Sequence, residues 1–390
     1  MNDFLQFKIS DELIKTLESR QIIQPTEIQN LIIPILQKGK NVFFESETGS
    51  GKTLAFLLPA ITKTLESNLP IKSNPQVLII SPTIELASQI KKEVQLLSNS
   101  SKSLKSFLAV GGSSVSRQIE SLKQKPQIII GNPGRIANLT ALKKFKLDKL
   151  HTVIFDEADR LTVKEMRNFI QAILQAVPKK GVQYSACSAT LSEETCNLLS
   201  DLIKTNTDNF EFEYKAINTK NVLQKSIEHW AIFSEQRKKT DTLKSFIKAT
   251  PEDKKILVFT SPAKNVEPLC KNLNQKKITA SALYTNLKNQ ERQQILDNFR
   301  NGKVRILITS DLAARGLDIP NIDYVVQMNV PKKNDFYIHR AGRTARAGTK
   351  GVTVCIGDAY EMRLLKTIEQ DLNLIVYPKK VFGGKISSEG

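Results

Sequence analysis

The chain has 390 residues, of which 40% are hydrophobic, enough for two globular domains of roughly 150 to 200 residues each. Lys and Arg number 57 against 39 Asp and Glu, a formal net charge of +18, which favours an anionic polymer or surface as partner, with a merely lysine-rich soluble protein as the alternative. The four cysteines form no CxxC pair, which excludes a disulfide framework and a cysteine zinc site, and the lack of a signal-like core or of an apolar run of about 18 residues predicts a soluble cytoplasmic protein.

The amino-terminal segment predicts two helices. Residues 10–19, SDELIKTLES, start with Ser10 as an N-cap and place their apolar residues on one helical face. In the segment IIQPTEIQ, residues 22–29, Pro25 can open a second helix in its first turn.

The segment SETGSGKT, residues 46–53, lies between a strand-like apolar run and a helix-like run. A strand, a glycine-bearing turn and a helix in this order form a phosphate cradle of backbone N–H groups. Gly49 and Gly51 allow the tight backbone, Lys52 can reach the β- and γ-phosphates, and Thr53 can place its hydroxyl on Mg²⁺. The strict phosphate-loop pattern has Gly where this segment has its first Ser, so an ordinary Gly/Ser turn is the alternative. The flanking elements favour a nucleoside triphosphate site.

Alternating strands and helices are predicted on both sides of a polar segment. Helical patterns occur at 84–97, 166–177 and 289–298, and apolar runs typical of buried parallel strands occur at 77–81, 107–110, 128–131, 152–159, 256–261, 279–284, 304–310, 324–329 and 351–357. This alternation predicts two α/β domains with doubly wound parallel sheets. We expect an N-terminal domain at 1–205, a flexible linker with room for one strand at 206–221, a C-terminal domain at 222–378, and a short, basic, disordered tail at 379–390.

Two acidic residues, Asp156 and Glu157, follow the apolar run TVIF, where an open α/β sheet presents its ligand site. Two adjacent acids alone are typical of a solvated loop. After a buried strand and a phosphate loop, however, Asp156 fits a direct or water-mediated Mg²⁺ ligand. Glu157 then fits a base that polarises the attacking water.

The second domain carries the cluster HRAGRTAR, residues 339–346, but no phosphate loop of its own. A solvated basic helix face is the alternative interpretation. Guanidinium groups that reach a γ-phosphate from another domain stabilise the charge of phosphoryl transfer, and such arginine fingers act only when the domains close. We therefore expect each domain to hold half of one site.

These motifs resemble, in order and over nearly the whole chain, those of the DEAD-box RNA helicases of helicase superfamily 2. The family's phosphate loop begins with Ala or Ser, and its name-giving motif is DEAD, residues 156–159. The segments SAT at 188–190 and SDLAARGLD at 310–318 complete the set. The resemblance implies two tandem RecA-like domains, an RNA-stimulated ATPase with helicase activity, and ATP and Mg²⁺ as cofactors.

The resemblance also implies a role for individual residues. Phe4 would stack on adenine and Gln29 would bind its edge, and the other ATP-binding residues would be Thr48, Gly49, Ser50, Gly51, Lys52, Thr53, Gly316 and Asp318. The catalytic residues would be Lys52, Asp156, Glu157, Arg343 and Arg346. Thr53 and Asp156 would bind Mg²⁺, partly through water. Ser188 and Thr190 would couple hydrolysis to strand separation. The RNA track would be formed by Pro82, Thr83, Gly111, Gly112, Pro133, Gly134, Arg135, Arg292 and Ser310.

The chain departs from the family pattern at Ile84, Asn132, residues 284–285 and Asn289. These positions fall on the RNA track and on the surface of the second domain, so they bear on RNA affinity. They spare the residues assigned to ATP.

The resulting prediction is a monomeric ATP-dependent RNA helicase that contacts mainly the sugar-phosphate backbone, with little sequence specificity. Its two domains would close when ATP and RNA bridge them, and would thereby separate short duplexes or remodel RNA–protein complexes. Two alternatives stay open. One is a slowly cycling RNA-binding clamp that serves as a platform for partners, and the other is a DNA helicase.

Overall fold

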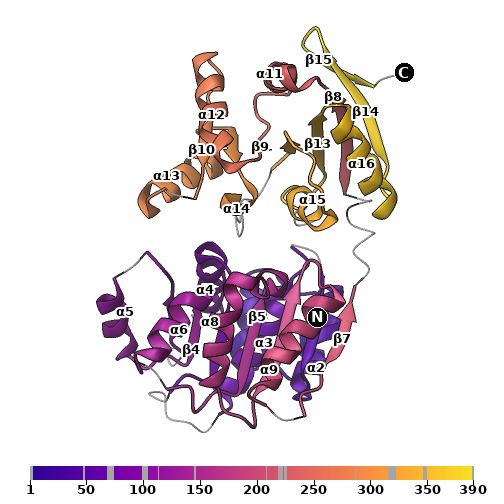
Figure 1. Cartoon of the computed structure of the whole chain (residues 1–390). Coiled ribbons are helices and arrows are strands. Elements are labelled where there is room, and N and C mark those ends of the chain that lie inside the picture. Colours follow the sequence, from indigo (N-terminus) through magenta and orange to yellow (C-terminus); the bar gives the residue numbers. More distant parts are fainter. Residues whose placement is uncertain are drawn as a thin grey trace. The chain divides into compact units, whose positions relative to one another are not determined.

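The computed structural model describes residues 3–46, 49–67, 74–98, 104–112, 114–144, 146–207, 209–217, 223, 226–285, 287–314, 322–345 and 349–388. The chain divides into two compact units, a first unit of residues 1–217 and a second unit of residues 218–390 (Figure 1). Each unit is an α/β domain built on a largely parallel sheet. The predicted fold class is therefore confirmed.

The first unit is built on a parallel sheet that has seven strands within the described residues, in the order β3-β4-β2-β5-β6-β1-β7. These strands are β1 (Val42–Glu45), β2 (Val77–Ile80), β3 (Ser106–Ala109), β4 (Ile128–Gly131), β5 (Thr152–Asp156), β6 (Gln183–Ser188) and β7 (Glu213–Ala216). Every residue of β2, β4, β5 and β6 is buried, as expected for parallel strands that are covered on both faces.

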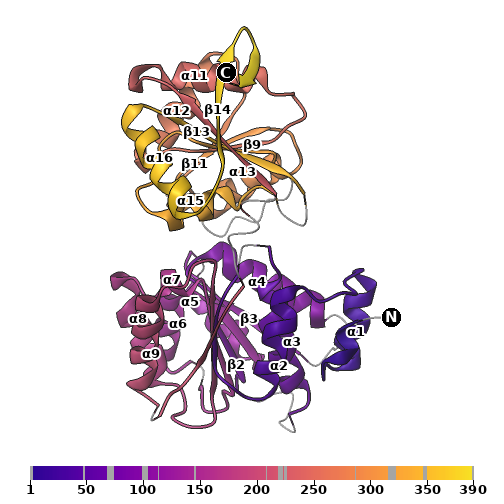
Figure 2. The same cartoon turned by 90° about the vertical axis from the view of Figure 1, so that its right-hand side faces the viewer.

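Helices cover both faces of this sheet (Figure 2). The apolar faces of α1 (Asp11–Ser19), α2 (Glu27–Gln37), α3 (Lys52–Leu65) and α4 (Ile84–Ser98) form one core cluster with the sheet. A second cluster on the opposite face takes residues from α5 (Val115–Leu122), α6 (Pro133–Ala141), α7 (Ala158–Leu161), α8 (Lys164–Gln175) and α9 (Glu193–Lys204). A 3₁₀ turn, η1 (Asp3–Gln6), precedes them.

The first two helices begin at polar caps. Ser10 is the N-cap of α1, as predicted. The prediction that Pro25 lies in the first turn of α2 was wrong, because the helix begins at Glu27, its N-cap is Thr26 and Pro25 precedes the cap. Thr26 and Gln29 form a capping box, in which the Thr26 N–H donates to Gln29 Oε1 at 2.9 Å. This cap fixes the side chain of Gln29.

The first unit extends beyond its predicted end at residue 205. Strand β7 pairs in parallel with β1, with Val42 opposite Glu213, and Phe212 stacks on Phe43 with ring centroids 4.0 Å apart. These contacts make residues 212–216 part of the sheet and core of the first unit, which ends at Ile217, so the predicted linker of 206–221 begins too early.

The second unit is built on a sheet that has eight strands within the described residues, in the order β10-β11-β9-β12-β13-β8-β14-β15. They are β8 (Ile227–Phe233), β9 (Ile256–Phe259), β10 (Ser281–Leu283), β11 (Ile306–Thr309), β12 (Tyr324–Gln327), β13 (Gly351–Gly357), β14 (Val376–Phe382) and β15 (Lys385–Ser388). All pairs are parallel except β14 with β15.

One face of the second sheet packs against α11 (Lys239–Ala249) and α12 (Val266–Gln275). The opposite face packs against α13 (Asn289–Arg300), α14 (Asp311–Ala314), α15 (Asn334–Ala341) and α16 (Ala359–Asp371). Two short 3₁₀ turns, η2 (Gln236–Lys238) and η3 (Ala263–Asn265), precede α11 and α12.

The predicted disordered tail at 379–390 is wrong for its described part. Residues up to 388 form the antiparallel β14–β15 hairpin, in which Val381 pairs with Ile386. Both side chains pack against the apolar cluster under α11. Their burial stabilises the position of the hairpin on the second unit. Gly383 and Gly384 provide the turn with positive φ angles of 58° and 74°.

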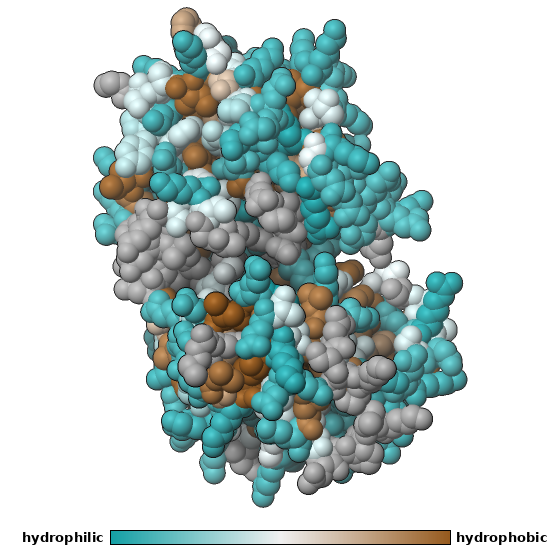
Figure 3. All heavy atoms as spheres, turned by 180° about the vertical axis from the view of Figure 1, so that it is seen from behind, coloured by the Kyte–Doolittle hydropathy of each residue, from teal (hydrophilic) through white to brown (hydrophobic). Residues whose placement is uncertain are grey.

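Figure 3 shows one face of the molecule, where apolar residues form patches among hydrophilic side chains. In the part of the chain that the structure describes, no helix combines the length and the apolar character that a membrane span requires.

Candidate functional site

Most of the predicted ATP and RNA residues of the first unit that the structure describes follow strands at one edge of its sheet. Parallel strands all end at the same edge, where open α/β sheets bind their ligands. Two adjoining groups of strands matter here. The first group is β1, β6 and β5, and the second is β2, β4 and β3. The first group leads into segments 46–53 and 156–157, assigned to ATP, and into the coupling segment 188–190. The second group leads into segments 82–83, 133–135 and 111–112, assigned to RNA. The topology therefore places the two sets side by side.

The phosphate loop has the backbone that its glycines predict. Gly49 and Gly51 have φ angles of +85° and +95°, a region that side chains disfavour. Gly51 is the N-cap of α3, so Lys52 and Thr53 form the first turn of that helix. Lys52 Nζ donates a hydrogen bond to the backbone carbonyl of Ser46. Thr48 lies outside the described residues.

The predicted adenine-binding residues are both engaged within the protein. Gln29 is 2% exposed, and its Nε2 donates to the Gly51 carbonyl at 3.1 Å. This bond joins the start of α2 to the phosphate loop. Phe4 is fully buried and lies edge-on to Phe7, with ring centroids 6.1 Å apart. Stacking of Phe4 on adenine stays a prediction, and it requires the ring to be uncovered.

Asp156 is a buried carboxylate at the end of β5. Its Oδ1 accepts a hydrogen bond from Cys187 Sγ at 3.3 Å. Burial and, to a smaller extent, the neighbouring Glu157 charge raise the pKa of Asp156 to about 6, against the lowering effects of Cys187 and Lys52. A nearby cation would lower the pKa of such a carboxylate, because it stabilises the charged form.

Glu157 adopts a left-handed backbone conformation, with φ 51° and ψ 55°, at the start of α7. This conformation is uncommon for a residue with a side chain, and such strain clusters at functional sites. It therefore supports the functional interpretation of Glu157 over that of an ordinary loop acid.

The predicted coupling segment contacts the DEAD segment directly. Ser188 Oγ donates to Asp159 Oδ1 at 2.6 Å, and Asp159 also pairs with Arg160 at 3.0 Å. The Thr190 N–H donates to Ser188 Oγ at 3.4 Å. No role was predicted for Asp159 from the sequence, although Asp159 is the last residue of the DEAD motif and its place in that motif pointed to a function.

The RNA candidates of the first unit lie at or near helix starts. Thr83 precedes α4, and its Oγ1 accepts from the Leu86 N–H at 3.3 Å. Pro133 is the first residue of α6, so Arg135 lies in the first turn of that helix. Free N–H groups of helix starts favour phosphates. Ile84, where the family has Arg, packs against the core cluster of α1 to α4.

The candidate ATP and RNA residues of the second unit that the structure describes are buried or half-buried. A solvated basic helix face, the alternative interpretation, would leave its side chains exposed. Arg343 is 6% exposed, and its Nε donates to the His339 carbonyl at 3.2 Å. Ser310 is buried at the end of β11. Arg292 donates from Nη2 to the Ala313 carbonyl at 2.8 Å, which links α13 to α14. Gly316, Asp318 and Arg346 lie outside the described residues.

Sequence reasoning missed the role of Arg340 in the same cluster. Its Nη1 donates to Gln327 Oε1 at 3.1 Å and to the Asn329 carbonyl at 2.6 Å, and its guanidinium lies 5.4 Å from the centroid of the Phe259 ring. An ion pair with Asp311 completes its surroundings. Arg340 is therefore a structural centre of the second unit.

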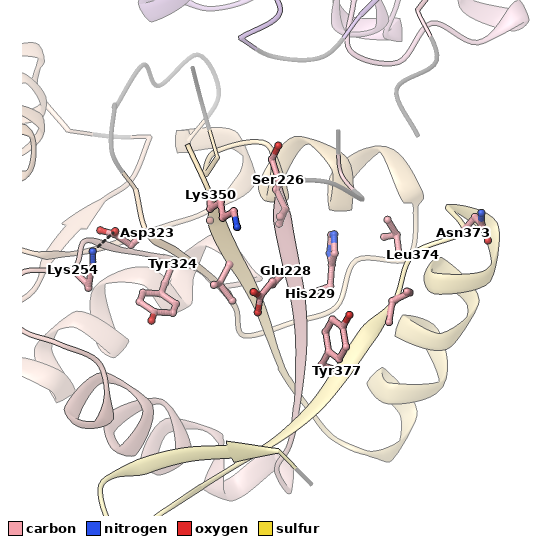
Figure 4. Close-up of a pocket in the computed structure, with 14 residues that line it drawn as sticks. Ser226, Glu228, His229, Lys254, Asp323, Tyr324, Lys350, Asn373, Leu374 and Tyr377 are labelled. Carbon is pink, nitrogen blue, oxygen red and sulfur yellow. Dashed lines mark ion pairs between the residues drawn. The ribbon is translucent and has the colours of Figure 1, made fainter. Parts of the chain in front are cut away.

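A pocket with a volume of about 490 Å³ lies elsewhere, at the start of β8, β12 and β13 (Figure 4). Its lining includes Glu228, Tyr324 and an ion pair of 3.2 Å between Lys254 and Asp323. No residue assigned to ATP or RNA lines it. This pocket is thus separate from the candidate site.

Comparison with known proteins agrees with this arrangement. Residues 26–198 match the DEAD/DEAH box helicase family and residues 238–348 match the helicase conserved C-terminal domain. The DEAD-box ATP-dependent RNA helicase CshC of Bacillus cereus is 34% identical over 360 residues, which cover 92% of this chain and 88% of CshC. The probable ATP-dependent RNA helicase YfmL of Bacillus subtilis is 32% identical over 366 residues, which cover 94% of this chain and 93% of YfmL.

The fold also matches that of a solved complex. S. cerevisiae Dbp5 bound to RNA and ADP BeF3 superimposes with a TM-score of 0.84 at 26% identity, over 97% of this chain and 96% of that chain. The family matches in both halves of the chain, the relatives that align over nearly its full length and the two-domain fold all agree on one family. This chain belongs to the DEAD-box ATP-dependent RNA helicases.

Proposed function

We propose that this chain hydrolyses ATP in response to RNA, and that it locally separates short RNA duplexes or remodels RNA–protein complexes. The observation that carries the proposal is the arrangement at the edge of the first sheet, where the phosphate loop and acids adjoin the RNA segments. The bond between Ser188 and Asp159 connects the DEAD acids to the coupling segment. A change at the phosphates can therefore reach the neighbouring segment through direct contacts.

The ATP chemistry is assigned to residues of the first unit. Backbone N–H groups around Gly49 and Gly51 and the ammonium of Lys52 would bind the phosphates. Glu157 would orient the attacking water and accept its proton. These residues follow β1 and β5, two strands separated in the sheet by β6 alone.

The oxygens of Thr53 and Asp156 fit Mg²⁺, which prefers oxygen ligands and takes few of them from protein when phosphates supply the rest. Among the described residues, no three His, Cys, Asp or Glu side chains gather as a complete cage. The burial of the Asp156 carboxylate at the end of β5, next to Glu157, supports a cation position there. When bound, the ion would neutralise phosphate charge.

The second unit would complete the site. Arg343 and Arg346 would stabilise the γ-phosphate charge once the two domains close around ATP and RNA. Closure needs both ligands, since neither alone supplies the full coupling free energy. Helix starts at Thr83 and Pro133 would bind RNA phosphates, which carry no sequence information.

A steady-state ATPase assay with and without single-stranded RNA tests the proposal. The wild-type chain should turn over faster with RNA, and Glu157→Gln should lower turnover by orders of magnitude while ATP and RNA still bind. Glu165→Gln, at an exposed position of α8, is the matched control and should keep the wild-type rate. If Glu157→Gln hydrolysed ATP at that rate, the assignment of the base would be wrong.

The same assay separates the alternatives. Equal stimulation by DNA and RNA of one sequence would favour a DNA helicase. A burst of phosphate release without steady turnover would favour a slowly cycling clamp.

A further inference from the structure

The two faces of the β14–β15 hairpin differ in exposure. Val381 and Ile386 pair with each other and pack inward. On the opposite face, Phe382 pairs with Lys385, and Lys380 lies two residues before Phe382 and so on the same side of the strand. Lys380, Phe382 and Lys385 are all exposed, and together they form the outer face of the hairpin.

The hairpin is fixed to the second sheet. Lys379, on the inward side, places its ammonium 5.2 Å from the centroid of the Trp230 ring and donates to Ser388 Oγ at 3.0 Å. The glycine pair at 383–384 closes the turn. Figure 1 shows the ribbon in yellow beside α11. The outer face is therefore presented on an ordered ribbon, which lowers the entropy cost of binding.

The outer face combines an aromatic ring with two ammonium groups. Phe382 is 88% exposed. A single exposed apolar side chain is normal on a protein surface, so the ring alone carries no inference. Between two lysines, however, it has the chemistry that binds single strands, in which bases stack on aromatic rings and lysines neutralise phosphates.

We propose that the outer face of the hairpin binds single-stranded RNA that extends beyond the RNA track. This inference rests on the RNA-binding function proposed above and adds a second contact to it. Positive charge and an exposed ring match the phosphates and bases of one RNA strand. An acidic protein segment would use the lysines but would have no base to stack on Phe382, so the structure favours RNA.

The position of the hairpin sets the RNA length that can reach it. Ser310 follows β11, and β9, β12, β13 and β8 lie between β11 and β14 in the sheet. At about 4.8 Å per strand, the axes of β11 and β14 are about 24 Å apart across the sheet, which is the minimum path from Ser310 to the hairpin. At about 3.4 Å per nucleotide of a stacked strand, roughly seven further nucleotides are the fewest that can span this path. An RNA that fills only the track leaves the outer face empty.

The test measures RNA affinity of the full chain with a non-hydrolysable ATP analogue, using single strands of about 10 and about 30 nucleotides. Phe382→Ala should raise the Kd for the long RNA about fivefold or more, the loss of one stacked base. The double variant Lys380→Gln/Lys385→Gln should reduce the salt slope of log K by up to about 1.4 with the long RNA. Neither variant should change binding of the short RNA.

Matched controls come from the same unit. Tyr360→Ala removes another exposed ring, 53% exposed at the start of α16, and Lys276→Gln/Lys277→Gln removes two exposed charges after α12. Both should bind the long RNA like the wild type. Phe382→Trp should retain the affinity, because indole also stacks on bases. Unchanged melting temperatures would show that the variants stay folded.

Long-RNA affinities equal to wild type in both hairpin variants would overturn the proposal and leave the face to a protein partner. Equal losses with short and long RNA would also overturn it, because the short RNA does not reach the hairpin. If the wild-type chain bound no RNA and showed no RNA-stimulated ATPase, the proposed function itself would fail. These results are distinguishable, since the last one appears without any hairpin variant.

Discussion

Arg340 holds Asp311 by two hydrogen bonds, from Nε to Oδ1 at 2.6 Å and from Nη2 to Oδ2 at 2.7 Å. Asp311 follows Ser310, an RNA candidate, and Arg340 lies one helical turn before Arg343, a candidate arginine finger. The pair therefore ties the two candidate segments of the second unit together. The Arg340 side chain is only 5% exposed, so solvent screens this ion pair little.

We expect Arg340→Gln to lower the free energy of unfolding of the second unit by roughly 3 kcal/mol, because it leaves the Asp311 charge without its partner. RNA-stimulated turnover should fall as well. Arg340→Lys keeps the charge but loses the two-pronged geometry, so its effect should be intermediate. Denaturant unfolding and ATPase assays measure both effects.

A matched control is Arg237→Gln, which removes an exposed ion pair with Glu235 and should cost less than about 1 kcal/mol. Combined with Asp311→Asn, Arg340→Gln should cost less than the sum of the two single changes. Strict additivity would show that the two side chains do not act as a pair.

Gly51→Ala should weaken ATP binding at least about tenfold, a loss of roughly 1.4 kcal/mol or more. The new Cβ would lie 2.4 Å from Gln29 Nε2, so the phosphate loop or Gln29 must move. Gly181→Ala is the control, because its φ of +78° gives the same backbone strain but nothing lies within 4 Å of a Cβ there. Nucleotide titration and melting curves test this. Equal ATP affinity of both variants would contradict the role of the contact.

His151 makes the first unit sensitive to acid. Burial and, secondarily, the charge of Lys63 lower the pKa of His151 to about 4. Between this value and the usual 6.5 the unfolded chain binds more protons than the folded one, so stability should rise with pH across this window and be fully present above it. The contribution is at most about 3 kcal/mol. His151→Gln should flatten the slope of stability between pH 4 and pH 6.5, and an unchanged slope would contradict the assignment.

Most interior strands of the two sheets were predicted, because buried parallel strands read as unbroken apolar runs, such as VLII in β2. Strand β8, IEHWAIF, was not predicted. Strand β6, QYSACS, was not predicted, because it is fully buried yet half polar. Its Gln183 is accommodated by hydrogen bonds of 2.8 Å to the carbonyls of Leu36 and Lys40. Strand β7 lies in the segment 206–221, for which the sequence left room for one strand. The β14–β15 hairpin was not predicted, because its alternating polar residues resemble a loop in sequence.

The motifs of the site were predictable because each is local in sequence. Contacts between motifs were not, since pairs such as Ser188 with Asp159 depend on which strands are neighbours. The roles of Thr48, Gly316, Asp318 and Arg346 stay predictions.

The boundary at residue 217 leads to a prediction about fragments. A fragment of residues 1–217 should fold and bind ATP, whereas residues 1–205 should be less stable. The shorter fragment loses β7 and so leaves the edge of β1 unpaired, and it uncovers Phe43, which Phe210 and Phe212 otherwise cover. Each lost phenylalanine contact removes burial worth roughly 1.5 to 3 kcal/mol. Melting curves of the two fragments measure the difference, and equal stability would contradict the role of β7.

The longer fragment also tests whether each domain holds half of the site. Without Arg343 and Arg346, residues 1–217 should bind ATP but show almost no RNA-stimulated turnover. Arg346→Ala in the full chain should slow hydrolysis by about 10³-fold or more, as for other arginine fingers, and should leave ATP affinity of the first unit unchanged. Full RNA-stimulated ATPase activity in the fragment would show that the arginines of the second unit are not required, and that all catalytic groups reside in the first.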